Sequence, residues 1–129
     1  MTRIDEKYLF LPIELFIHLN IMQMFDFDEE SSWISVGEGV SRKIMSYNDD
    51  LMIVRVRFEK DAIGAIHQHV HTQSTYVLEG KFEFVIGEER KIISKGDTCL
   101  MPSHILHGCI CLEKGELLDT FTPFREDFL

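Results

Sequence analysis

Positive charge is scarce in this sequence. It has 13 Lys and Arg against 22 Asp and Glu, which gives a formal net charge of -9, and the basic residues form no run. Because nucleic-acid binding depends on a basic surface, DNA and RNA are not expected as partners. A small anionic ligand would need a local cation or a metal ion to overcome the overall field.

Cysteine is scarce as well. The three cysteines are an odd number without CxxC spacing, and two of them alternate along a predicted strand: Cys99, Cys109 and Cys111. A disulfide framework is therefore not expected. We interpret them as reduced core cysteines of a cytoplasmic protein, with a metal or redox role as the lesser alternative.

An uninterrupted hydrophobic run is also missing. The most apolar stretch, Tyr8 to Met24, is broken by Pro12, Glu14, His18 and Asn20. It is too short to span a bilayer and no signal-type cleavage site follows, so no membrane segment is expected. Residues 1–23 are interpreted as an N-terminal extension, a short helix or an added strand, that packs on the domain or makes a dimer contact. The alternative is an unstructured or translated upstream segment.

The remaining residues, 24–129, have the pattern of an all-β domain. Residues 52–58 alternate between apolar and charged positions, which predicts a strand with one buried face. Turn signals then recur every eight to twelve residues or so, at Glu79–Lys81, Gly87–Glu89, Lys95–Asp97 and Lys114–Gly115. The pattern predicts one small antiparallel barrel or sandwich of about eight strands.

Histidines point to a metal. His67 and His69 alternate, so in a strand both imidazoles share a face, where they either repel as cations or share a metal as neutral ligands. His107 follows Pro102 in a predicted loop and can supply a third ligand. His71 is ambiguous, because strict alternation points it inward whereas a turn after His69 would reverse it. His18 and His104 are interpreted as ordinary non-ligand histidines, as isolated histidines usually are.

Two of these stretches resemble the cupin motifs. His67, His69, Gln73 and Gly80 match the first motif, and Gly96, Pro102 and His107 match the second. The resemblance implies a small single-domain cupin barrel, of the jelly-roll or double-stranded β-helix type. It also implies one divalent metal ion (Zn, Ni, Fe or Mn) held by His67, His69, Gln73 and His107.

The sequence departs from the general cupin pattern at four positions. Asp61 and His104 stand where the motifs have Gly, Cys111 replaces an Asn, and Gln73 replaces an acidic ligand. Asp, and to a lesser degree His, tolerates the left-handed backbone that such a Gly often marks, so the barrel is expected to form. The neutral Gln leaves the charge of the metal uncompensated, which favours an anionic or enolate-forming ligand.

Most of the domain resembles the KdgF-type cupins of pectin and alginate breakdown. The stretches that carry the resemblance are "YVLEGKFEFVIG" and "DTFTPFREDFL". It implies metal-dependent ring opening and ketonisation of 4,5-unsaturated uronates to linear keto acids, a sugar-acid substrate and a homodimer. Asp119 is the implied general base, Phe121 packs on the sugar ring, and Arg125 binds the substrate carboxylate.

Other readings remain open at this stage. Arg55 and Arg57 are reserve ligands for a carboxylate or plain surface residues. The protein could instead be another metal-dependent cupin, such as a dioxygenase or sugar isomerase, or a non-catalytic sugar-acid-binding cupin. A purely structural barrel would leave the histidine spacing unexplained.

Overall fold

The computed structural model describes residues 23–129. The expected N-terminal extension, residues 1–23, and His18 thus lie outside the described residues, apart from Gln23. The described part contains eight antiparallel strands and two short 3-10 helices. The strands are β1 (Ile34–Gly37), β2 (Val40–Tyr47), β3 (Met52–Phe58), β4 (Ile63–His67), β5 (Thr72–Ile86), β6 (Glu89–Ser94), β7 (Thr98–Met101) and β8 (His107–Thr122), and the helices are η2 (Asp28–Glu30) and η3 (Glu126–Phe128).

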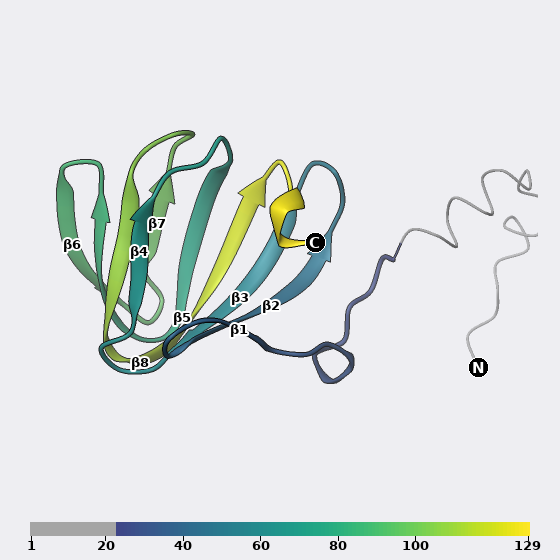
Figure 1. Cartoon of the computed structure of the whole chain (residues 1–129), viewed down its shortest axis with the longest axis horizontal. Helices are drawn as coiled ribbons and strands as arrows, with labels where there is room; N and C mark the ends of the chain where they lie inside the picture. The colour runs from purple at the N-terminus through teal and green to yellow at the C-terminus, as the bar shows by residue number, and fades with distance from the viewer. Residues whose placement is uncertain (1–22) are drawn as a thin grey trace, which may run out of the picture.

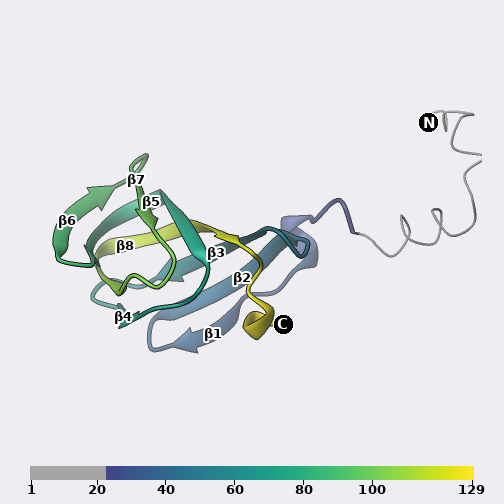
Figure 2. The same cartoon turned by 90° about the horizontal axis from the view of Figure 1, so that it is seen from above.

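Two long strands, β5 and β8, join the two faces of the barrel. The two halves of each strand pair with different neighbours. The first half of β8 pairs with β4 and with the second half of β5. The second half of β8 pairs with β3 and with the first half of β5. Figure 1 shows β8 running down one side of the molecule and up the other, and Figure 2 shows the strands arranged around the barrel. This is the expected jelly-roll architecture.

Glycines allow these strands to bend. Gly80 in β5 has a positive φ of 85°, and a Cβ there would lie 2.5 Å from the carbonyl oxygen of Glu113. A Cβ on Gly115 in β8 would lie 2.2 Å from the carbonyl oxygen of Glu79, so neither bend has room for a side chain. The turns predicted at Glu79–Lys81 and Lys114–Gly115 are therefore wrong, because these signals mark bends within continuous strands. The turns at Gly87–Glu89 and Lys95–Asp97 are confirmed.

The core follows the alternation of β3. Met52, Val54 and Phe58 are buried, whereas Arg55 and Arg57 face outward. One core cluster lies around Phe58 and Phe82, whose rings meet edge to face with centroids 5.3 Å apart. A second cluster of Met52, Val54 and Phe121 lies at the other end of the same sheet. Burial of each such side chain contributes about 1.5–3 kcal/mol, so both clusters stabilise the barrel.

Other local expectations also hold. Asp61 and His104 adopt the left-handed backbone, with φ of 71° and 65°. The three cysteines are free thiols, and Cys109 and Cys111 are buried. The stretch for which no membrane segment was expected, Tyr8 to Met24, lies outside the described residues apart from Gln23 and Met24. Within residues 23–129 no helix has the length and apolar character needed to cross a membrane.

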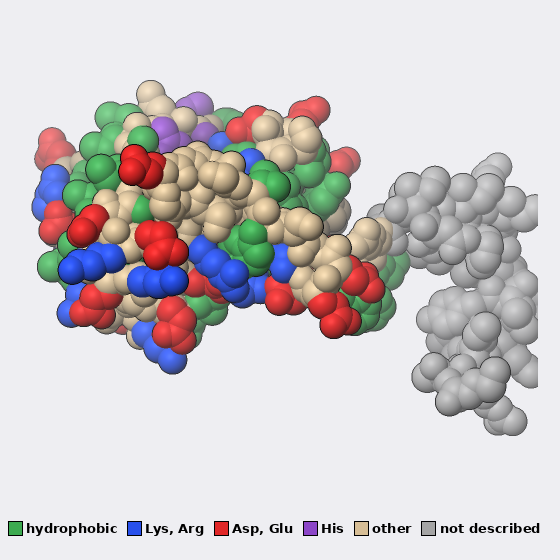
Figure 3. Space-filling model, turned by 60° about the horizontal axis from the view of Figure 1, so that its bottom comes forward, with side chains coloured by type: hydrophobic (Ala, Val, Ile, Leu, Met, Phe, Trp, Pro, Cys, Tyr) green, Lys and Arg blue, Asp and Glu red, His purple; other side chains and the backbone are tan. Residues whose placement is uncertain are grey.

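The surface separates two kinds of polar side chain. In Figure 3 the bottom of the barrel comes forward, and it carries interspersed Lys, Arg, Asp and Glu side chains. The visible histidine side chains gather at the upper edge of that view. The histidine-bearing edge of the barrel is therefore the candidate location of a functional site.

Candidate metal centre

Three histidines from two separate parts of the chain meet at this end of the barrel. His67 ends β4 and pairs directly with His107, which begins β8. The ring centroid of His69 lies 5.4 Å from that of His67 and 4.8 Å from that of His107. One nitrogen from each ring lies within 4.8 Å of the others, so the three can bind one ion.

Strand alternation predicted that His67 and His69 lie together, but it does not explain how they do so. Strand β4 ends at His67, and His69 lies in the segment that leads to β5, so strand alternation does not hold both side chains. A backbone hydrogen bond of 2.8 Å from the His104 N–H to the His69 carbonyl holds this segment against the loop before β8. His104 thus supports the site through its backbone.

Hydrogen bonds to backbone carbonyls fix the tautomer of each histidine. The Nδ1 atoms of His67, His69 and His107 lie 2.7, 3.0 and 2.8 Å from the carbonyl oxygens of Ala65, His71 and Ile105. Because a carbonyl only accepts, each Nδ1 carries the proton and each Nε2 keeps a free lone pair. This is the usual arrangement of metal-binding histidines. The buried Nε2 of His107 has no hydrogen-bond partner within residues 23–129, as expected of an atom that binds an ion.

Burial and nearby positive charge favour the neutral form of His69 and His107. The pKa of His107 is lowered to about 4, chiefly by burial and to a smaller extent by the neighbouring His67 and His69 as potential cations. Burial also lowers the pKa of His69, as does the positive charge of Arg125. Since the neutral imidazole is the form that binds metals, the lowered pKa values of His69 and His107 favour metal binding at neutral pH.

Gln73 could provide a fourth ligand atom, its amide oxygen. Its buried side chain places Oε1 3.1 Å from Nε2 of His69. Because Nδ1 of His69 carries the proton, two acceptor atoms face each other here, and a cation beside both would remove their repulsion. The other end of the amide, Nε2, donates a 3.0 Å hydrogen bond to Oγ1 of Thr75. The donor set, three neutral imidazoles and one amide oxygen, therefore fits a divalent transition metal.

The same hydrogen bonds continue to a buried carboxylate. Oγ1 of Thr75 donates a 2.6 Å hydrogen bond to Oδ1 of Asp119, which lies opposite Thr75 on β8. Burial raises the pKa of Asp119 to about 6, against the opposing effects of Thr75, Gln73 and Arg125. A carboxyl group with this pKa can both take and return a proton near neutral pH.

The C-terminal residues complete one side of the site. Phe121 is buried, with its ring centroid 5.8 Å from that of His69. The Arg125 guanidinium carbon lies 5.1 Å from the Phe121 centroid, and its Nε and Nη2 donate to Asp127 at 3.0 and 2.8 Å. The structure thus brings all three residues of the expected catalytic set, Asp119, Phe121 and Arg125, beside the histidines.

His71 belongs to the wall of the site. Its Nε2 donates a 3.1 Å hydrogen bond to the Phe124 carbonyl, and its ring centroid lies 5.3 Å from that of His69. The group of three possible ligands does not include it. His71 instead joins the segment before β5 to the C-terminal residues.

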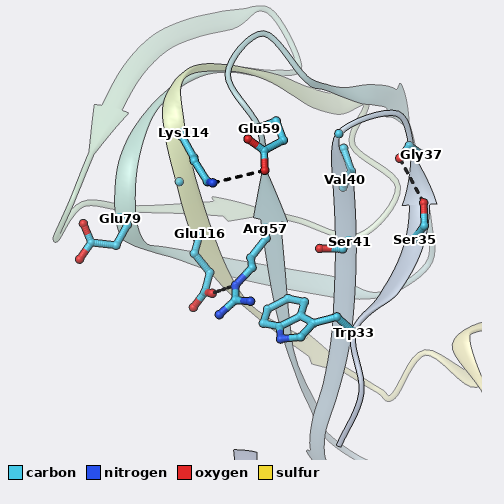
Figure 4. A pocket seen from close by; sticks show the side chains of 12 residues that line it. Trp33, Ser35, Gly37, Val40, Ser41, Arg57, Glu59, Glu79, Lys114 and Glu116 are labelled. Carbon is cyan, nitrogen blue, oxygen red and sulfur yellow. Dashed lines mark hydrogen bonds and ion pairs between the residues drawn. The ribbon is translucent and has the colours of Figure 1, made fainter.

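The idea that Arg55 and Arg57 are reserve carboxylate ligands is wrong. Both side chains face outward and pair with Glu116, and the Arg57 guanidinium carbon lies 3.9 Å from the centroid of Trp33. They are therefore separated from the histidines by the sheet. Figure 4 shows Arg57, Glu116 and Trp33 in a hollow of about 860 Å³, where β1 to β3 meet the bend of β8. Among the residues that the structure describes, 23–129, no histidine lines this hollow.

Arg42 lies near this site and was not among the residues predicted from the sequence. This residue lies on β2 with its guanidinium carbon 3.7 Å from the ring centroid of Phe128. The signal was available, since Val40, Arg42 and Ile44 alternate and would share the apolar face of a strand. An arginine on such a face is unusual and indicates a role beyond solubility.

A small jelly-roll barrel with three histidines gathered at one end is the architecture of a cupin. Residues 54–121 match the cupin domain family. The chain is 44% identical over 110 residues to the pectin degradation protein KdgF of Dickeya dadantii (strain 3937), which covers 84% of this chain and 100% of the relative. The chain belongs to the cupin family and, within it, to the group of KdgF.

Solved structures agree with this assignment. An RmlC-like cupin from Shewanella frigidimarina NCIMB 400 is 38% identical with a TM-score of 0.81, covering 83% of this chain and 96% of the other. The structure of KdgF from Halomonas sp. is also 38% identical, with a TM-score of 0.80, covering 84% of this chain and 100% of the other. The similarity therefore extends over nearly the whole length of both relatives.

Proposed function

We propose that this protein is a metal-dependent cupin that converts 4,5-unsaturated uronate monosaccharides to linear keto sugar acids in the breakdown of polyuronides such as pectin. The observation that carries the proposal is the 44% identity over the full length of the pectin degradation protein KdgF. The positions of His67, His69 and His107 support it, because these residues could hold a metal ion close to the proposed acid–base residue.

The metal would be held by His67, His69, Gln73 and His107. When bound, it acts as a Lewis acid that polarises a substrate oxygen and stabilises developing negative charge. The protein ligands are all neutral, so they do not cancel this charge. In a chain of net charge -9, the site would thereby attract the uronate anion that the rest of the surface repels.

Arg125 and Phe121 would orient the substrate. The guanidinium of Arg125 presents parallel N–H donors that match a carboxylate, and Asp127 holds it in place without using every donor. Phe121 offers an apolar face against which a sugar ring packs. Together they would place the anomeric carbon near Asp119.

Asp119 would move the protons. As a base it removes the proton of the anomeric hydroxyl, the carbonyl forms at C1, and the bond from C1 to the ring oxygen breaks. The electron pair of that bond leaves on the ring oxygen, which becomes an enolate because it is attached to the C4=C5 double bond. Asp119 then returns the proton to C4, which gives the ketone. The hydrogen bond from Thr75 holds the carboxylate throughout.

The test follows the ultraviolet absorbance of the C4=C5 bond in freshly made unsaturated galacturonate. We expect absorbance loss above the spontaneous rate, abolished by a chelator and restored by a divalent metal. Asp119→Asn should lower kcat by about 100-fold or more with metal content unchanged, whereas Asp50→Asn, on an exposed loop, serves as the matched control. A trace equal to that of buffer from metal-loaded protein would refute the proposed reaction. Metal-dependent oxygen consumption would instead support a dioxygenase.

A further inference from the structure

We propose that Arg42 and Arg125 form a two-arginine site for the carboxylate of the sugar acid, so that Arg42 determines specificity for anionic substrates. The inference rests on the proposed function, since it identifies how the same site recognises a uronate. Arg42 lies far from the metal-binding motifs in the sequence, and only the barrel brings it to the site.

The register of β2 directs Arg42 to the inside of the barrel. Arg42 pairs with Val56 of β3, and Ile44 pairs with Val54, which is fully buried. Directly opposed residues of antiparallel strands lie on the same face of the sheet. Arg42 therefore shares the inner face with the core cluster of Met52, Val54 and Phe121, whereas its neighbour Lys43 pairs with the outward-facing Arg55.

Both guanidinium groups lie on one aromatic ring beside the metal centre. The guanidinium carbons of Arg42 and Arg125 are 3.7 and 4.1 Å from the ring centroid of Phe128. Phe128 in turn meets Phe121 edge to face, with centroids 5.7 Å apart, and Phe121 contacts His69. Both positive charges thus lie on a ring that packs against Phe121, the residue on which the sugar is proposed to pack.

The positive charge of this pair is only partly compensated. Asp127 binds Arg125 through Nε and Nη2. Within residues 23–129, Arg42 forms no salt bridge, and its buried Nε has no hydrogen-bond partner. Two guanidinium groups and one carboxylate leave a net positive charge. Burial and the charge of Arg125 both lower the pKa of Arg42, so an incoming anion would relieve an unfavourable environment.

A second arginine provides the comparison. Arg57 lies on Trp33 with its guanidinium carbon 3.9 Å from the ring centroid, which closely resembles the stacking of Arg42 on Phe128. However, Nε of Arg57 donates to Glu116 at 2.8 Å. A stacked arginine whose Nε is already paired is a structural element of the surface, whereas Arg42 keeps donor capacity for a ligand.

The experiment uses Arg42→Met, Arg42→Lys and the matched control Arg57→Met in metal-loaded protein. Turnover of unsaturated galacturonate gives KM and kcat, and calorimetry gives the Kd of galacturonate, which binds without ring opening, and of the neutral sugar galactose. For Arg42→Met we expect KM and the galacturonate Kd to rise about 10- to 100-fold, as when one charged hydrogen-bond donor is lost, with kcat changed less than about threefold. Galactose binding and the Arg57→Met enzyme should be unchanged.

Each outcome decides between the claims. If Arg42→Met has the wild-type melting temperature and metal content and keeps the wild-type KM and Kd, the two-arginine site is wrong. If wild type binds galacturonate through Arg42 but opens no unsaturated uronate, the proposed reaction fails while the carboxylate site stands. If wild type neither binds nor turns over uronates, both fail. Should Arg42→Met not fold, Arg42→Lys decides, because Lys keeps the charge but not the planar fork, and an unchanged KM would overturn the proposal.

Discussion

Replacing Gln73 by Glu tests why this barrel uses an amide where other cupins use an acid. The amide Nε2 donates to Thr75, and Thr75 donates to Asp119, through hydrogen bonds of 3.0 and 2.6 Å. A carboxylate at position 73 cannot donate, so Thr75 would have to donate to one of two anions. Gln73→Glu therefore removes the hydrogen bond to Thr75, makes two carboxylates compete for the Thr75 hydroxyl, and places a second negative charge near Asp119.

The size of the effect follows from the geometry. The two hydrogen bonds place the new carboxylate roughly 5–6 Å from that of Asp119, and Coulomb repulsion at that distance is about 3 kcal/mol for an effective dielectric constant near 20. This raises the pKa of Asp119 by about 2 units. Asp119 must be deprotonated to act as a base, so wild-type activity should fall when acidification protonates it. The pKa of Asp119 for this fall should be at or below about 6, because a bound cation stabilises the carboxylate. In Gln73→Glu this fall should occur at a pH about 2 units higher.

The assay is the pH dependence of kcat for metal-loaded enzyme. Gln68→Glu is the matched control, because Gln68 is exposed on the same segment between His67 and His69. It adds an equal charge near the histidines without touching Thr75. A Gln73→Glu profile that coincides with that of the control would refute the role of the Gln73 amide in holding Asp119, even if metal binding became tighter.

Two further predictions concern stability. In metal-free protein the pKa of His107 is lowered to about 4 in the folded state. The unfolded state therefore binds the proton at a higher pH, and stability is lost as the pH falls from about 6.5 to 4. Measured by urea unfolding, wild type should therefore lose about 3 kcal/mol relative to His107→Gln between pH 7 and pH 4, and a constant difference would contradict the buried neutral histidine. Gly115→Ala should lower the free energy of unfolding by about 2–4 kcal/mol, because its Cβ would meet the Glu79 carbonyl at 2.2 Å. Gly37→Ala, whose nearest contact is Val40 at 4.0 Å, should stay within about 1 kcal/mol, and equal losses would show that the bend tolerates a side chain.

Local sequence patterns predicted much of the fold. The alternation of Met52 to Phe58 predicts which face of β3 is buried, because side chains of a strand alternate with a period of two whatever surrounds it. Glycine signals were less specific. In the sequence, Gly80 and Gly115 resemble turn signals. In the structure, the positive φ at Gly80 and the close approach at Gly115 belong to bends in strands that continue beyond them. Whether the chain reverses or bends depends on which strands pair on both sides, and those partners are distant in sequence.

The sequence by itself determined the all-β class and the residues able to bind a metal, because period-two alternation and the spacing of His67, His69 and His107 are local or motif-like properties. Only the tertiary structure decided what these residues do together. The hydrogen bond between Thr75 and Asp119 joins positions 44 residues apart. The stacking of both Arg42 and Arg125 on Phe128 likewise requires β2 and the C-terminal helix η3 to lie at the same end of the barrel. Such contacts arise from strand register and closure, which set distances that no short stretch of sequence encodes.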